Sequence, residues 1–172
     1  MDNYIKEYAR KFEELLSKSK SKSDYKKVSV GVLEDEILKD IERKPEILYE
    51  TDNIGRNLGM ICCVYGLERV VLKCLEDNYA STQQDIEGYN LGMYACLGGL
   101  IYPAFKSLDN KKAALQQNSS GLNIGMCAAF AKMEPVVLKA LQNKEAALQK
   151  DNVGENIISI AQKKNLEPEL YY

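Results

Sequence analysis

Five cysteines are the residues of this sequence with the most versatile chemistry, because thiolates act as nucleophiles, form disulfides and bind zinc. They are Cys62, Cys63, Cys74, Cys96 and Cys127. An odd number, with two residues adjacent, is a poor disulfide framework. No pair has the Cys-x-x-Cys spacing that is typical of zinc sites and redox motifs. We therefore expect free thiols, buried as small apolar side chains.

The absence of histidine narrows the possible chemistry further. It excludes Ser-His-Asp and Cys-His nucleophilic systems, histidine general bases and metal centres with histidine ligands. Neither the phosphate-binding G-x-x-x-x-G-K-[ST] motif nor the dinucleotide-binding G-x-G-x-x-G motif occurs. We expect that the protein is not an enzyme and has no metal, no cofactor and no catalytic residue. An enzyme based on carboxylates, lysine or tyrosine is the alternative, although no motif indicates one.

Length and composition are those of one globular protein with a core of useful size. The chain has 172 residues, of which 45% are hydrophobic and 28% charged. A formal net charge of −2 gives no overall attraction to nucleic acid or anionic membrane. No apolar run is long enough to cross a bilayer, and residues 1–6 are too polar to open a secretory signal. We expect a cytoplasmic location with reduced cysteines, and delivery into a host cell as an effector is an alternative.

The elements that position these residues follow a repeat of 33 residues. Each unit opens with Asp or Asn, has glycine three residues later and asparagine two residues after the glycine. The repeated glycines and asparagines are Gly55, Gly88, Gly121 and Gly154 with Asn57, Asn90, Asn123 and Asn156. Gly-Met follows the asparagine in three units, whereas the fourth has Ile158-Ser159. Such a regular pattern predicts stacked structural units.

Within the second unit the local signals are those of a turn followed by two helices. Gly88 supplies a turn conformation that other residues avoid, and Asn90 is suited to cap a helix over residues 91–97. Gly98-Gly99 ends this helix, and a second one runs over about residues 100–108. Polar residues lie just after the second helices, where we expect the left-handed conformation to close them. These residues are Asp77, Asn78, Asn110 and Asn143.

A turn, two antiparallel helices and a return loop in 33 residues resemble the ankyrin repeat. Residues 85–90 are similar to the D-x-x-G-x-T opening of that family, and residues 95–99 to its A-A-x-x-G segment. Residues 67–71 and 135–138 look like the start of its second helix. The resemblance covers about residues 52–164. It implies an all-α solenoid of stacked helix-turn-helix repeats with short turn fingers.

One stretch departs from the family, because N-[LI]-G-M replaces its T-P-L-H sequence. The threonine–histidine hydrogen bond of that sequence cannot form here. Asparagine can replace threonine as a helix cap, and we expect methionine to fill the space of the missing leucine side chain. We expect the same fold with lower stability than a consensus array.

The repeat divides the chain into consecutive parts. We expect an N-terminal capping helix (1–18), a Lys/Ser-rich linker (19–27), a degenerate repeat (28–51), full repeats at 52–84, 85–117 and 118–150, and a truncated C-terminal repeat (151–172). In the degenerate repeat, residues 33–48 match a second helix, and the first helix near residues 24–30 is degenerate or lost.

The first helix, over about residues 3–17, has one apolar face that suits a cap on the first repeat. That face consists of Tyr4, Ile5, Tyr8, Phe12, Leu15 and Leu16. A helix that binds a partner or lies on a membrane is the alternative. The Lys/Ser-rich segment is read as a solvated linker, with a basic contact for phosphate or an acidic protein as its alternative.

The resemblance also implies where a partner would bind, at the turn tips and on the exposed side of the first helices. In register, the candidate partner-binding residues are Ile54, Arg56, Val64, Tyr65, Ile86, Glu87, Tyr89, Leu97, Ser119, Ser120, Leu122 and Phe130. Asn53, Gln84, Gln117 and Lys150 hold further positions of this kind. Exposed apolar residues with a polar rim are typical of a binding surface. The alternative is structural packing between neighbouring turns, which we expect more of Val64, Leu97 and Phe130 than of Tyr89 and Leu122.

These observations predict a non-enzymatic protein-protein interaction module, such as a scaffold, regulator, inhibitor or effector-type adaptor. Its partner is expected to be another protein of unknown identity, with no nucleic acid and no membrane as partner. The alternative is a structural protein that self-assembles into a homo-oligomer through the truncated C-terminal repeat or the Tyr171-Tyr172 end. Fold alone does not decide between them.

Overall fold

The computed structural model describes residues 4–18 and 23–166, with the backbone alone at residues 15, 16, 18 and 23–29. Every regular element in these residues is helical, as the sequence predicts, and the single β-type contact is an isolated bridge between Thr51 and Asn57. In the part of the chain that is described, no helix is both long and apolar enough to cross a membrane.

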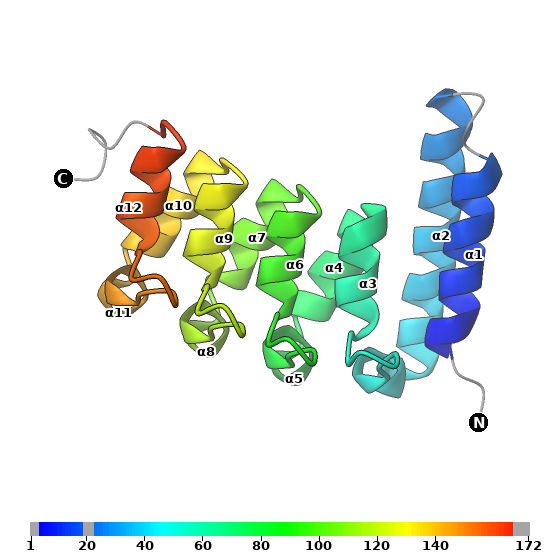
Figure 1. Cartoon of the computed structure of the whole chain (residues 1–172). Helices are drawn as coiled ribbons and strands as arrows, with labels where there is room; N and C mark the ends of the chain where they lie inside the picture. The colour runs from blue at the N-terminus through cyan, green and yellow to red at the C-terminus, as the bar shows by residue number, and fades with distance from the viewer. Residues whose placement is uncertain (1–3, 19–22, 167–172) are drawn as a thin grey trace.

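The central helices form repeated groups of three (Figure 1). The first unit contains α3 (Leu58–Tyr65), α4 (Glu68–Leu75) and α5 (Asn78–Thr82), and the second contains α6 (Leu91–Leu97), α7 (Ile101–Ser107) and α8 (Lys111–Leu115). The third contains α9 (Ile124–Phe130), α10 (Glu134–Leu141) and α11 (Lys144–Leu148), and the fourth is described through α12 (Ile157–Lys163).

The units stand side by side, so that like helices form rows (Figure 1). We call the side of α3, α6, α9 and α12 the front face and the side of α4, α7 and α10 the back face. The turns that precede the front helices lie at the foot of the row together with α5, α8 and α11. Neighbouring front helices pack against one another, and α3, α6 and α9 also pack against the back helix of their own unit.

The predicted asparagine caps are confirmed, and they do more than cap. Asn90 Oδ1 accepts a hydrogen bond from the Met93 backbone N–H at 3.0 Å, and Asn90 Nδ2 donates to the carbonyl of Ala113 and to Gln116 Oε1, both at 2.9 Å. Gln116 Nε2 in turn donates to the carbonyl of Thr82 in the preceding unit at 2.7 Å. Asn57 and Asn123 make the same bonds in their own units, and Gln149 Nε2 donates to the carbonyl of Leu115 in the preceding unit at 2.8 Å. The fully buried asparagines therefore tie the third helix of their unit to the start of the front helix, and Gln116 and Gln149 extend the network to the preceding unit.

The glycine of the N-[LI]-G-M stretch makes a hole that the next unit fills. A Cβ on Gly59 would lie 2.9 Å from both Cys74 Cβ and Leu91 Cδ1, so the neighbouring side chains already occupy its space. Ile124 and Ile157 fill the corresponding holes of the next two units. The residue after the next unit's asparagine therefore occupies the space beside each of these glycines.

A short third helix in each of the first three units corrects an expectation about the ends of the second helices. Asp77 has φ −94°, and its carboxylate accepts from the Ala80 backbone N–H at 2.8 Å, so it begins α5 and does not end α4 in a left-handed conformation. Asn110 and Asn143 begin α8 and α11 in the same way. Polar residues occur both after the C-terminus of a helix and at the N-cap of a helix. These residues were expected to end the second helices, whereas they are N-caps of the third helices.

The N-terminal part differs from the predicted boundaries. The helix α1 (Tyr4–Lys18) is confirmed, with Ile5, Tyr8 and Phe12 buried. One helix, α2 (Ser23–Arg43), takes in the end of the predicted linker, the stretch near residues 24–30 where the first helix was expected to be degenerate or lost, and most of the predicted second helix. Residues 23–27 of the predicted linker are helical because serine and lysine are compatible with a helix.

The predicted second helix over residues 33–48 is too long at its C-terminal end. The helix α2 stops at Arg43, and the 3-10 helix η2 (Pro45–Tyr49) follows, because proline cannot continue a helix. Linker residues 19–22 and the C-terminal residues 167–172, with Tyr171-Tyr172, lie outside the described residues.

Candidate functional site

The turns at the foot of the front helices are held by one acidic or amide side chain each. Asp85 Oδ1 accepts from the backbone N–H groups of Glu87 at 3.0 Å and Tyr89 at 2.8 Å, and Gly88 takes φ 80° to complete the turn. Asp52, Asn118 and Asp151 hold their turns in the same way. The sequence therefore fixes the shape of each turn locally.

Backbone hydrogen bonds then join each turn to the next. The N–H of Ile86 donates to the carbonyl of Ile54 at 3.0 Å, and the N–H of Ser119 donates to that of Glu87 at 2.8 Å. Asn152 makes the same bond to Ser120 at 3.0 Å. The turn tips consequently form a continuous, pre-organised edge, which lowers the entropic cost of binding a partner.

Seven of the twelve candidate residues are exposed as the sequence predicts. They are Val64, Ile86, Glu87, Leu97, Ser119, Ser120 and Phe130. Val64, Leu97 and Phe130 occupy the same position near the end of α3, α6 and α9, and their exposed fractions are 56%, 65% and 43%. The side chains that were expected to pack between turns are therefore among the most accessible.

The other five candidates are partly buried, which corrects the predicted patch. They are Ile54, Arg56, Tyr65, Tyr89 and Leu122. Asp85 donates its N–H to the carbonyl of Tyr89 at 3.0 Å, and Asn118 does the same to Leu122. This pairing across the turn leaves the side chains of Tyr89 and Leu122 against the core, so the expected ranking is reversed.

Two of these partly buried residues have specific partners. Tyr65 stacks on Phe12 of α1 with ring centroids 4.3 Å apart. Arg56 Nε and Nη2 both lie 2.8 Å from Asp52 Oδ2. The contact of Tyr65 with Phe12 does not appear in a repeat alignment, because α1 lies outside the repeat.

Val64, Leu97 and Phe130 form a row of apolar side chains across the front face, which we call the front row. Packed helices stand about 8–10 Å apart, so the row spans three adjacent helices in register. At the same position α12 has Lys163, which pairs with Glu155, and Lys164 Nζ lies 5.2 Å from the ring centroid of Phe130. The row thus changes from apolar to basic at its C-terminal end.

A groove lies at the opposite end of the front row, between α1, the first turn and α3. Its volume is about 690 Å³, and Ile5 and Ala9 of α1 form one wall while Val64 and Tyr65 form the other. Asn53 and Arg56 lie at its polar edge. The structure therefore brings four candidate residues of the first unit together. The α1 wall was missed, because the 33-residue pattern does not extend to α1 and so does not give the position at which α1 packs.

The five thiols offer no reactive nucleophile. All are free and buried, as the sequence predicts. Burial raises the pKa of Cys74 and Cys127 to about 12 and holds the pKa of Cys62, Cys63 and Cys96 well above the usual value. They are consequently protonated thiols near neutral pH. Across residues 4–18 and 23–166, no group of three or more Cys, Asp or Glu is placed to hold a metal ion.

Comparison with models of known protein families gives no match, and comparison with curated proteins gives none either.

Proposed function

We propose that this chain is an ankyrin-type repeat protein without catalytic activity, which binds a partner protein through the front row and the adjoining turns. The 33-residue unit of a turn and two antiparallel helices, stacked with like helices side by side, supports the ankyrin assignment. The short third helix and the asparagine–glutamine network are the departures from that pattern.

The observation that carries the binding proposal is the register of the front row. A single exposed apolar side chain on a protein surface has no special meaning. Three of them at the same position of consecutive helices form a continuous strip, and such strips mark binding surfaces. The turns at the foot of the same helices supply Glu87, Ser119 and Ser120 as exposed polar groups. Apolar side chains together with polar ones are typical of a protein interface.

The spacing of the front row favours an α-helix of the partner. Seven residues of an α-helix rise about 10.5 Å, which is close to the distance between packed neighbouring helices. A partner helix that crosses the front face with an apolar residue at every seventh position would therefore contact Val64, Leu97 and Phe130 in turn. The groove beside α1 would receive its end.

Self-assembly through the fourth unit has less support. Ile158 stands where the first three units have the glycine that receives the next unit's side chain. The helix α12 therefore lacks the hole into which a further unit would pack.

The proposal is tested by affinity capture from lysates of the source cell. Two variants are compared with the wild type, and each of them changes one exposed leucine. Leu97→Glu places a charge in the front row, whereas Leu148→Glu changes a leucine on α11 that is 77% exposed. We expect a partner that is retained by the wild type and by Leu148→Glu and is lost by Leu97→Glu. The thermal unfolding curves of both variants should stay close to the wild type, since surface substitutions usually change stability by less than about 0.5 kcal/mol.

Binding of the captured partner should also depend on its helix. A synthetic peptide of that helix should compete, and a version with its apolar residues moved off the seven-residue spacing should not. If Leu97→Glu retains the same proteins as Leu148→Glu, the front row is not the binding surface.

A further inference from the structure

Hydrogen bonds between the turns run in one direction along the row. In the fourth unit, the backbone N–H of Asn152 donates to the carbonyl of Ser120 at 3.0 Å, and Asn152 Nδ2 donates to the carbonyl of Ser119 at 2.9 Å. The N–H groups of Ile86 and Ser119 likewise donate to the turn before their own. The second, third and fourth turns are therefore each held by a turn that precedes them.

The first turn has the same donors but no acceptors for them. Asn53 holds in this turn the position that Asn152 holds in the fourth, and it lines the groove beside α1. At the end of the row, α1 stands beside α3 (Figure 1), and within the described residues no turn of this kind precedes α1. None of the residues that the structure describes accepts a hydrogen bond from the N–H or Nδ2 of Asn53.

The groove also has an apolar position that a preceding turn covers elsewhere in the row. Tyr89 follows the glycine of the second turn, and its side chain packs against the core. Burial, and next the neighbouring Cys127 of α9, raise the pKa of Tyr89 above its usual value, so this side chain lies close to the next front helix. Ile61 of α3 holds the position of Cys127 in the first unit, and it lines the groove.

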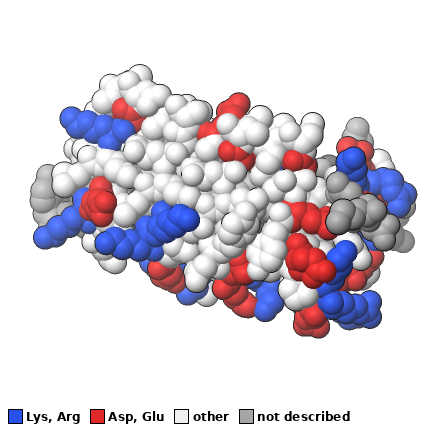
Figure 2. Space-filling model, turned by 90° about the horizontal axis from the view of Figure 1, so that it is seen from below, with Lys and Arg blue, Asp and Glu red and all other residues white. Residues whose placement is uncertain are grey.

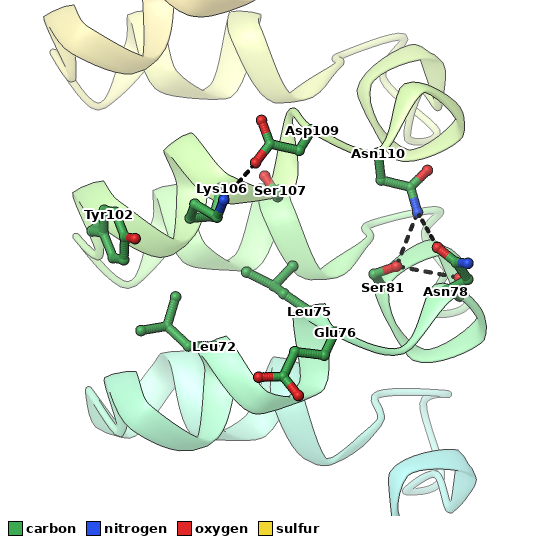
Figure 3. Close-up of a pocket in the computed structure, with 10 residues that line it drawn as sticks. All are labelled: Leu72, Leu75, Glu76, Asn78, Ser81, Tyr102, Lys106, Ser107, Asp109 and Asn110. Atoms are coloured by element: carbon green, nitrogen blue, oxygen red, sulfur yellow. Dashed lines mark hydrogen bonds and ion pairs between the residues drawn. The ribbon is translucent and has the colours of Figure 1, made fainter.

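The hollow on the back face, between α4 and α7, differs from the groove because most of its polar side chains are paired (Figure 3). Its volume is about 480 Å³. Asn110 Nδ2 lies 3.2 Å from Ser81 Oγ and 3.4 Å from Asn78 Oδ1, and Lys106 pairs with Asp109 at 2.7 Å. The groove beside α1, with the two donors of Asn53, is therefore the better candidate for a binding site.

The surface around the turns carries little charge. Seen from below, the middle of the foot of the molecule is largely uncharged (Figure 2). In the groove itself, Arg56 pairs with Asp52 at 2.8 Å. The interactions open to an occupant are therefore mainly hydrogen bonds from Asn53 and apolar contacts.

We propose that the groove beside α1 binds a short peptide segment of the partner protein, which takes the place of a preceding turn. This inference rests on the proposed function, because the segment adjoins the partner helix on the front row. Two successive carbonyls of the segment accept hydrogen bonds from Asn53, as those of Ser119 and Ser120 do from Asn152. An apolar side chain beside them covers Ile61. The partner is thus bound through its backbone as well as through the side chains of its helix.

The distance between the front row and Asn53 suits a short segment. The helix α3 has eight residues and rises about 12 Å from the turn to the level of Val64. An extended chain covers about 3.3 Å per residue. About four residues beyond the end of the partner helix consequently reach Asn53.

Proline in place of Asn53 removes both donors and preserves the turn. Asn53 is the second residue of a turn closed by the bond from the Gly55 N–H to the Asp52 carbonyl at 3.1 Å, and proline is favoured at this position. We expect Asn53→Pro to melt at the wild-type temperature or slightly above it, and to bind the captured partner at least about tenfold more weakly. Asn53→Ala keeps the N–H and should lose less. Wild-type affinity in Asn53→Pro overturns the proposal.

Asn152→Pro is the matched control, because it removes the same two donors from the fourth turn. There both donors bind the third turn, so we expect the melting temperature to fall. An equal fall in Asn53→Pro would mean that the Asn53 donors already have acceptors in the free protein. That result would also overturn the proposal.

A peptide probe tests the groove without the partner. A cyclic peptide of residues 117–122 carries the two carbonyls that Asn152 binds. In amide NMR titrations, we expect it to shift the backbone and side-chain signals of Asn53 with millimolar affinity, in the wild type and in Leu97→Glu alike. No shift at Asn53 at several millimolar peptide overturns the proposal.

The two variants separate this inference from the proposed function. If the partner is lost by Leu97→Glu and binds Asn53→Pro as tightly as the wild type, the front row is the binding surface and the inference about the groove is wrong. If the peptide shifts the Asn53 signals while no captured protein depends on Leu97, the groove binds peptide and the proposed function of the front row is wrong.

Discussion

Inside the repeat, residue identity hardly changes from unit to unit, whereas at the front row it changes at every step. Asn57, Asn90 and Asn123 are fully buried and make the same hydrogen bonds in three successive units. The front-row position holds Val, Leu, Phe and then Lys163. Interior positions must each fit the same neighbours, while front positions meet only solvent or a partner. Under the proposed function, the constant columns determine the stack and the variable column determines what it binds.

The largest expected effect comes from removing a buried asparagine. Asn90→Ala loses the cap of α6 and leaves the carbonyl of Ala113 without its side-chain donor, and we expect the free energy of unfolding to fall by about 3 kcal/mol. Asn156→Ala is the control, because Asn156 caps α12 in a unit described without a third helix. Its loss should be about 1 kcal/mol. Equal losses in urea denaturation would mean that the bonds from Asn90 to Ala113 and Gln116 add no stability.

A smaller effect is expected from filling one glycine hole. In Gly92→Ala the new methyl group would overlap Ser107 Oγ and Ile124 Cδ1, and overpacking of this kind costs about 1–3 kcal/mol. Gly31→Ala adds the same group to the helix α2 with no atom within 4 Å, so it should stabilise by about 0.5–1 kcal/mol. The two melting temperatures should therefore move in opposite directions. A shared direction would show that helix propensity, and not the contact between units, decides the outcome.

The predicted and the missed features differ in the range of the interactions that cause them. Turns and asparagine caps were predictable, because a glycine with positive φ or a polar cap acts within a few residues. The third helices were missed, because a polar residue after a helix is compatible with ending one helix or beginning another. Only the contact of Asp77 with the Ala80 N–H decides for the second.

Accessibility was harder to predict than helix position, because it depends on neighbouring units. Tyr89 and Leu122 have turn positions, yet their side chains lie against the core. Leu97 is 65% exposed although it belongs to an otherwise buried helix. The groove beside α1 likewise requires the contact of Phe12 with Tyr65, which joins residues far apart in the sequence. The sequence therefore located the turns and front helices of each unit but not which of their residues reach solvent.

The smallest effect is expected at an exposed position, the Asp109 carboxylate on the back face. Hydrogen bonds from Lys106 and then Lys139 hold its pKa below the usual value. Because the folded pKa lies below the unfolded one, the contribution to stability is full above pH of about 4 and is lost as the pH falls through the folded pKa. The carboxylate is half exposed, so the contribution should stay below about 1 kcal/mol.

Asp109→Asn tests this contribution and, with it, the contrast between interior and surface columns. Wild type and variant should differ slightly in urea denaturation at pH 7, and the difference should disappear in strong acid, where the wild-type carboxyl is protonated too. High salt should also reduce the difference, since exposed ion pairs are screened. If Asp109→Asn costs as much as Asn90→Ala, then Lys139, which covers Phe105 and pairs with Asp109, contributes to the stack as strongly as the buried amides. In that case the surface columns are not free to vary, and the division between stacking and binding positions fails on the back face.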